Sequence, residues 1–296
     1  MTETTLTPAG SLVEITPGIG LHVRSWPAGG RAGGRPFLLV HGLASNARLW
    51  DGVAAALAAA GHPVHAVDLR GHGESLPPDG APEVGYDTAT AAADVFAVAN
   101  RLRLLRPVLV GQSWGGNVVL DLAARWPQRP GGLALVDGGW LHLGDAYASF
   151  EECWAALAPP RLPPAPLERI RERLREFHPD WPDSGIEGTL GNFVTQPDGL
   201  ARIRLTRDRH RSILRSLWAH RPRELYPLVS TPVLLLPAGH LDAAGRRLRT
   251  ERVEEALAAL PGAEVSWYDG CDHDLHAQVP ERVAADLIRL ARRAPT

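Results

Sequence analysis

The segment GQSWG, residues 111–115, places one serine between two glycines, where an apolar run ends and a helix-like pattern begins. It matches Gly-x-Ser-x-Gly, a strained turn that presents a serine hydroxyl at the head of a helix. Such a serine can attack a carbonyl carbon, and the backbone N–H of Trp114 then points at the developing oxyanion. The apolar run Val108–Gly111 and the further glycine Gly116 strengthen the match. We therefore predict that Ser113 is a nucleophile and not merely a helix cap.

A serine hydroxyl is a weak nucleophile at neutral pH and needs a base within hydrogen-bond reach. Among the 12 histidines, His273 is the candidate, because it lies between the apparent last strand and the terminal helix. Sheets that carry this serine turn place the base last in the chain. His276 is the competitor, and we interpret it as a helix-start or hydrogen-bonding residue. The chain has no His-Glu-x-x-His pair, so no metal site is expected.

A carboxylate must orient the imidazole and stabilise its positive charge. Asp242 follows the strand-like run VLLLPAG in the segment GHLD, at a strand end, and is the predicted acid. Asp137, in LVDGG after the preceding strand, is the alternative. For Asp137 we favour the interpretation of a turn-forming residue before glycines.

The second oxyanion donor of such sites comes from the loop after an early strand. Here that loop is HGLASN, residues 41–46, and the backbone N–H of Leu43 is the candidate. Together with the N–H of Trp114 it would form the oxyanion hole. We interpret His41 as a residue that shapes this loop.

Short apolar runs alternate with amphipathic stretches along most of the chain, which is typical of strands joined by crossover helices. This pattern predicts an open, mostly parallel sheet with helices on both faces. Residues 11–15 and 20–26 alternate apolar and polar side chains and indicate a half-exposed hairpin. The predicted buried strands are residues 36–40, 63–68, 108–111, 132–139, 231–239 and 263–269. Loops at their carboxyl ends, including those with Ser113 and His273, should face one crevice.

Between residues 140 and 230 this alternation stops, and helix-like pieces are separated by proline clusters. A connection of this length must carry structure of its own, so we predict a helical lid inserted between core segments 1–139 and 231–296. Its aromatic side chains fit either pocket walls or lid core, and the pocket candidates are Trp140, Trp154, Trp181 and Trp218. The arginine-rich segment 202–225 is interpreted as a solvated helix face rather than an anion site.

The composition is that of an ordinary globular protein: 296 residues, 45% hydrophobic, 22% charged, with a formal net charge of −2. That balance does not indicate binding to nucleic acid or to an anionic membrane. Two cysteines are too few for a disulfide framework or a zinc site. The first residues show no signal-peptide pattern, and no apolar run is long enough to span a bilayer. We therefore expect a cytoplasmic protein without a cofactor, whose partner is a small hydrophobic substrate.

Five segments, in the expected order, resemble the α/β-hydrolase superfamily: HGLASNARLW, DLRGHGES, VGQSWGGNVVL, GHLD and CDHDLH. The resemblance covers almost the whole chain and is to the lid-bearing branch of esterases, lactonases, carbon–carbon hydrolases, perhydrolases and proline iminopeptidases. It implies a mostly parallel eight-stranded sheet and a triad of Ser113, His273 and Asp242. Epoxide hydrolases and haloalkane dehalogenases share similar surroundings but carry Asp at the serine position.

One departure from the family pattern concerns the charge beside the histidine. Family members often have Gly immediately before the catalytic histidine, whereas this chain has Asp272, and Asp274 follows. If either carboxylate approaches the ring, it should raise the pKa of His273.

These residues predict a cofactor-free serine hydrolase that cleaves an ester, lactone or thioester of a medium-sized hydrophobic molecule through an acyl-enzyme at Ser113. A carbon–carbon bond hydrolase, or a cofactor-free oxygenase or perhydrolase with the same triad, is the alternative. A receptor-like protein that binds a ligand with little or no turnover is the third interpretation, and the intact set of Ser, His and Asp counts against it.

Overall fold

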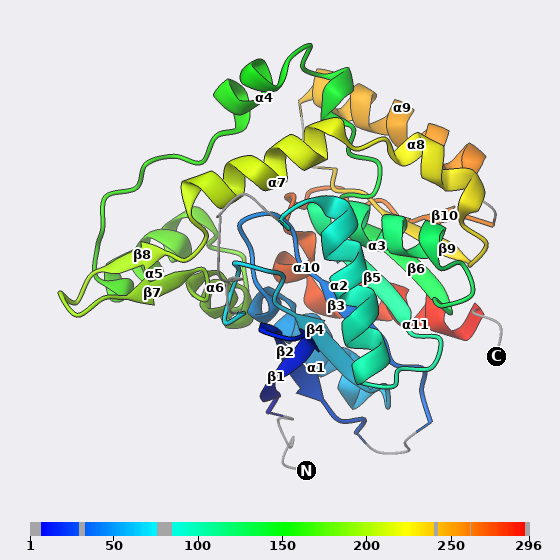
Figure 1. Ribbon diagram of the computed structural model, residues 1–296, viewed down its shortest axis with the longest axis horizontal. Helices are drawn as coiled ribbons and strands as arrows, with labels where there is room; N and C mark the ends of the chain where they lie inside the picture. The colour runs from blue at the N-terminus through cyan, green and yellow to red at the C-terminus, as the bar shows by residue number, and fades with distance from the viewer. Residues whose placement is uncertain (1–6, 30–32, 76–84, 240–241, 261, 294–296) are drawn as a thin grey trace.

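An eight-stranded sheet runs through the centre of the molecule, in the order β1-β2-β4-β3-β5-β6-β9-β10 (Figure 1). The computed structural model describes residues 7–29, 33–75, 85–239, 242–260 and 262–293. His240 and Leu241 of the GHLD segment lie outside them.

Six of the eight strands are parallel, as predicted. The hairpin of β1 (Ala9–Thr16) and β2 (Ile19–Trp26) is antiparallel, and β2 pairs antiparallel with the first strand of the parallel set. The parallel set consists of β4 (Val64–Val67), β3 (Phe37–Val40), β5 (Val108–Gln112), β6 (Gly132–Val136), β9 (Val233–Leu236) and β10 (Glu264–Val265).

The strand register brings the carboxyl ends of the central strands to one edge. Val40 pairs with Gly111, Gln112 pairs with Val136, and Val136 pairs with Leu236. The residues that follow these positions therefore begin their loops side by side, as parallel strands require.

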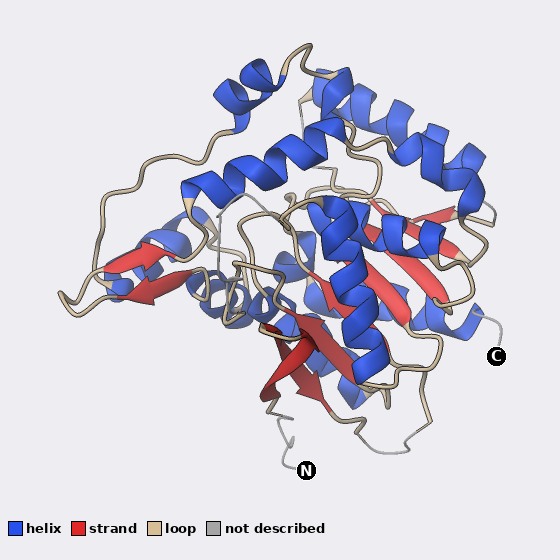
Figure 2. Cartoon of the chain, viewed as in Figure 1, coloured by secondary structure: helices blue, strands red, loops and turns tan. Residues whose placement is uncertain are grey.

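Helices cover both faces of the sheet, because successive strand residues point to opposite sides (Figure 2). In β3, Phe37 and Leu39 pack into a core cluster with α1 (Asp51–Ala59) and α11 (Pro280–Arg293). Leu38 and Val40 belong to the cluster on the other face, with α2 (Thr88–Arg101), α3 (Trp114–Arg125) and α9 (Ala243–Ala259).

The segment between β6 and β9, which we call the insert, holds a group of helices and a small hairpin. Its elements are η2 (Leu143–Asp145), α4 (Phe150–Leu157), α5 (Leu167–Phe177), α6 (Asp183–Leu190), β7 (Phe193–Thr195), β8 (Ala201–Ile203), α7 (Arg207–Ala219), α8 (Pro222–Leu225) and η3 (Tyr226–Leu228). In Figure 1, α7 crosses above the helices of the core, whereas α5, β7 and β8 lie to one side. The hairpin was not predicted, because its strands are three residues long and carry no buried-strand pattern.

The last predicted strand is shorter than expected. Of residues 263–269, Glu264–Val265 form β10, and a single bridge joins Tyr268 to Ala238. Both residues of β10 are exposed at the sheet edge, where one side of a strand has no partner to extend it. The chain then continues to α10 (Leu275–Gln278) and α11.

Gly116 allows α3 to lie against the loop after β6. A Cβ on Gly116 would come within 2.6 Å of the Gly139 backbone nitrogen, whereas one on Gly132 would meet only the Leu290 side chain, at 3.3 Å. We expect Gly116→Ala to destabilise the fold by about 1–3 kcal/mol or more, because backbone cannot move aside as a side chain can. Gly132→Ala, the matched control, should change the thermal midpoint little. Equal midpoints for both variants would contradict this account of the packing.

Candidate active site

Ser113 occupies the sharp turn between β5 and α3. Its backbone has φ 54° and ψ −123°, a strained conformation for a residue with a side chain. Its N–H donates to the Val136 carbonyl, at 2.9 Å, and ties the turn to β6. A Cβ on Gly111 would lie 2.1 Å from the Gly115 carbonyl oxygen, so this turn requires glycine at 111.

His273 forms a hydrogen bond with Asp137. Nδ1 of His273 lies 2.5 Å from Oδ2 of Asp137, whose side chain is 1% exposed. The other carboxylate oxygen, Oδ1, accepts from the Ala238 N–H at 3.0 Å and pairs with Arg249 Nη1 at 2.9 Å. The Asp137 N–H donates to the Leu236 carbonyl, and the residue has φ 43°. The loop after β6 thus aims this carboxylate at the histidine.

The prediction that Asp242 orients His273 is wrong in this structure, and the alternative, Asp137, holds that position. Asp242 is exposed and caps α9, because its carboxylate accepts the Gly245 N–H at 2.7 Å. An aspartate just before a helix is a favoured N-cap. The turn interpretation of Asp137 was incomplete, since its side chain also reaches the ring of His273.

The surroundings of His273 raise its pKa above the usual value. Partial burial lowers the pKa, but the hydrogen bond and charge of Asp137 outweigh that effect. Asp274 adds to the rise, as the sequence predicted for one of the two neighbouring carboxylates. The His273 side chain is 50% exposed.

His276 does not share this environment. It is fully buried against Trp50, with ring centroids 4.3 Å apart, and burial lowers its pKa to about 3. Neither ring nitrogen has a hydrogen-bond partner among the described residues. The ring is therefore neutral at physiological pH. Of the two interpretations of His276, the helix start is confirmed, because it is the second residue of α10, and the hydrogen-bonding role is wrong.

The loop that begins at His41 passes over the serine. A Cβ on Gly42 would lie 2.8 Å from the Ser113 Cβ. His41 is buried; its Nδ1 lies 2.7 Å from the Gly42 carbonyl oxygen and its Nε2 accepts the Leu69 N–H at 3.0 Å. These bonds fix one neutral tautomer and shape the loop, as predicted for His41. The loop therefore brings the backbone of Leu43 near the serine.

Trp114 begins α3, so its backbone N–H belongs to the first turn, whose N–H groups have no partner inside the helix. Its indole Nε1–H donates to Thr88 Oγ1 at 3.1 Å, and the Thr88 N–H donates to Ser216 Oγ of α7 at 2.8 Å. The residue beside the serine is thereby connected to the insert.

The four tryptophans proposed as pocket walls occupy three places. Trp140 is buried in the main core cluster, and Trp181 is buried against Leu49 and Ile186. Trp154 and Trp218 border the cluster of Phe150, Cys153 and Leu214, which also contacts Leu43. Packing explains the first two, so only Trp154 and Trp218 share a cluster with the loop over Ser113.

Sequence reasoning missed two residues next to the Asp137–His273 pair. Gln112, 1% exposed, donates through Nε2 to the His273 carbonyl at 3.2 Å and to Asp274 Oδ1 at 3.1 Å. Its place beside Ser113 was a usable signal. Arg249 lies on α9, and nothing in the pattern of that helix distinguishes it from its neighbouring arginines.

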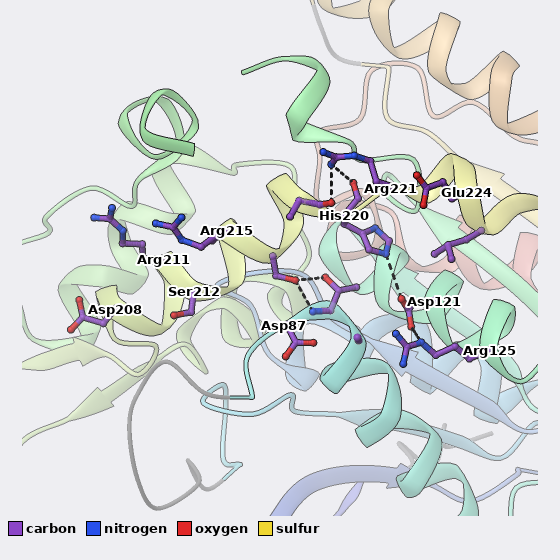
Figure 3. A pocket seen from close by; sticks show the side chains of 15 residues that line it. Asp87, Asp121, Arg125, Asp208, Arg211, Ser212, Arg215, His220, Arg221 and Glu224 are labelled. Atoms are coloured by element: carbon purple, nitrogen blue, oxygen red, sulfur yellow. Dashed lines mark hydrogen bonds and ion pairs between the residues drawn. The ribbon is translucent and has the colours of Figure 1, made fainter. Parts of the chain in front are cut away.

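A cavity of about 790 Å³ lies between the start of α2, α3, α7 and α8 (Figure 3). Its wall includes Asp121, which pairs with Arg125 and lies 3.6 Å from Nε2 of His220. Neither Ser113 nor His273 lines it. We therefore do not assign this cavity to the chemistry of the serine.

Within the described ranges, no group of three or more His, Cys, Asp or Glu side chains is placed to hold a metal ion. Over the same residues, no helix has the length and apolar character needed to cross a membrane.

Comparisons with known proteins point to one family. Curated relatives match part of the chain: bifunctional epoxide hydrolase 2 of Sus scrofa is 35% identical over 118 residues, 40% of this chain and 20% of that protein. A non-heme chloroperoxidase of Streptomyces lividans is 34% identical over 122 residues, 41% of each chain. The chain therefore spans less than half the length of these relatives.

A solved structure of E-2-(acetamidomethylene)succinate hydrolase has a TM-score of 0.74 and 23% identity, and the match covers 96% of this chain and 99% of that one. At this identity the likeness shows the fold alone. The sequence model of the Alpha/beta hydrolase family matches residues 37–286. Because that match includes most of the chain, the protein belongs to the alpha/beta hydrolase family.

Proposed function

We propose that this protein is a serine hydrolase that cleaves an ester, lactone or thioester bond of a medium-sized hydrophobic molecule. The observation that carries the proposal is the Asp137–His273 hydrogen bond. Asp137 follows β6, the strand that pairs with β5, and β5 leads into the strained turn of Ser113. Membership of the alpha/beta hydrolase family supports hydrolysis as the type of reaction, without specifying the bond. Ser113, in place of Asp, argues against the epoxide hydrolase reaction of the relative named above.

In the proposed reaction, Ser113 Oγ attacks the substrate carbonyl carbon while Nε2 of His273 takes the hydroxyl proton. Asp137 holds the ring through Nδ1 and stabilises its positive charge. The backbone N–H groups of Leu43 and Trp114 bind the oxyanion of the tetrahedral intermediate. Collapse breaks the bond to the alcohol or thiol, which leaves with the proton from His273. Water then repeats both steps on the acyl-enzyme and releases the acid.

The apolar side chains near the loop over Ser113 support a hydrophobic substrate. Leu43 packs on the cluster of Phe150, Cys153 and Leu214 from α4 and α7. The cluster itself is buried, but Leu43, Trp154 and Trp218 at its border are only partly buried and would present apolar surface to a substrate chain on this side of the serine, which favours a hydrophobic acyl or alcohol group.

Substitution of the serine tests the nucleophile. We expect Ser113→Ala to keep the thermal midpoint within a few degrees, to lower kcat by about 10³-fold or more, and to abolish covalent labelling by a fluorophosphonate. The labelling is read by mass spectrometry of the modified peptide. Ser11→Ala, on the exposed strand β1, is the matched control and should be labelled like the wild type. Undiminished turnover of purified Ser113→Ala would refute the assignment.

Assays on an ester, a lactone and a thioester with matched acyl chains identify the bond. A β-diketone in the same panel tests the carbon–carbon alternative. We expect turnover of at least one of the three acyl substrates and none of the β-diketone.

Substitution of the two aspartates tests the acid. Asp137→Asn should lower kcat by about 10³–10⁴-fold, because an amide no longer selects the ring tautomer that leaves Nε2 free to accept a proton. Asp242→Asn makes the same chemical change on α9, and asparagine caps a helix as well as aspartate does. We therefore expect wild-type kcat and stability for this control. The reverse result would restore Asp242 as the acid.

The pH dependence follows from the raised pKa of His273. A general base acts only when it is unprotonated, so kcat/KM should fall as the pH drops through this pKa. Since the pKa is raised, the midpoint of the acidic limb should lie above 6.5, the ordinary histidine value. A pH–rate profile measures it, and a midpoint at or below 6.5 would contradict the raised pKa.

A further inference from the structure

Arg249 contacts the carboxylate that contacts His273. Its Nη1 lies 2.9 Å from Asp137 Oδ1, and the same nitrogen donates to the Ala238 carbonyl at 3.0 Å. The arginine side chain is only 21% exposed, and Asp137 is almost fully buried. Such a pair is less screened by water than one on the surface.

The two oxygens of Asp137 therefore serve different partners. Oδ2 forms a hydrogen bond with His273, whereas Oδ1 pairs with the Arg249 guanidinium and accepts a hydrogen bond from the Ala238 N–H. When His273 is protonated, one carboxylate faces two cations. The charge that Arg249 neutralises is then less available to the imidazolium.

We propose that Arg249 is a positioning residue of the catalytic site that acts through Asp137: it pairs with Oδ1 and takes up part of the carboxylate charge that faces His273. The inference rests on the proposed function, in which His273 is the general base.

The helix that carries Arg249 is fixed at its start. Asp242 caps α9, and Arg246 pairs with Asp269 in the loop before α10. Arg249 follows the cap by seven residues, two helical turns. Asp242, which the sequence predicted as the partner of His273, thus caps the helix whose Arg249 pairs with Asp137, the residue that holds that position.

Charged groups from several elements face His273. Asp137, from the loop after β6, and Asp274, from its own loop, raise its pKa, and Arg249, from α9, lowers it. His276 of α10 is buried and neutral, because burial lowers its own pKa to about 3. Arg249 is the cation of this group that opposes the two carboxylates.

The test compares three neutral variants. Arg249→Met removes the charge and the hydrogen bonds, Arg249→Gln removes the charge but keeps a donor, and Arg247→Met removes the same charge from an exposed position on α9. Fluorophosphonate labelling rates and kcat/KM are measured from pH 5 to 9, and the ring of His273 is titrated by NMR.

We expect both Arg249 variants to move the acidic limb and the NMR titration of His273 to higher pH, since the full charge of Asp137 then attracts the imidazolium. At a pH below the wild-type midpoint, labelling should slow by about threefold or more. Arg249→Lys should restore most of the wild-type profile, and Arg247→Met should match the wild type.

An NMR titration of His273 that is the same in Arg249→Gln, Arg247→Met and the wild type would overturn the proposal. If Arg249→Met does not fold, Arg249→Gln and Arg249→Lys decide the question. The NMR titration needs no activity, so it tests Arg249 even if the wild-type serine proves unreactive toward the probe, a result that would refute the proposed function alone.

Discussion

The buried carboxylate of Asp137 is the constraint on which the candidate site depends. A charge that is 1% exposed is costly unless donors surround it, and this one has an N–H from Ala238, the ring of His273 and the guanidinium of Arg249. These donors come from three separate loops or helices. Through these contacts the carboxylate connects the loop after β6 with the loop after β9, the histidine loop and α9.

The sheet supplies the scaffold for this arrangement. Adjacent strands β5 and β6 end with Gln112 and Val136 in register, so Ser113 and Asp137 follow at neighbouring points. Both have positive φ, at 54° and 43°, which turns each side chain away from the strand direction. Such backbone strain persists only where the surrounding structure holds the residue in place. Here Gly111 and Gly138 let neighbouring backbone pack closely against the serine turn.

The insert contacts the core at two places, one beside Ser113 and one near the loop of His273. Through Ser216 and Thr88 it is linked to Trp114, and through Trp181 it packs against Leu49 and Ala277, close to the histidine loop. The ring of His273 is half exposed and therefore within reach of solvent.

Local patterns in the sequence were sufficient for the fold, the serine turn and the choice of His273 over His276. Strand and helix periodicity, glycine spacing and chain order are properties of short segments, and backbone sterics translate them directly into structure. The acid was different, because Asp137 and Asp242 each follow a buried strand. Only the packing of the loops decided that one carboxylate turns inward to His273 and the other caps α9. No local pattern in the sequence distinguished Arg249, because its partner Asp137 lies more than a hundred residues away and the two meet only through tertiary packing.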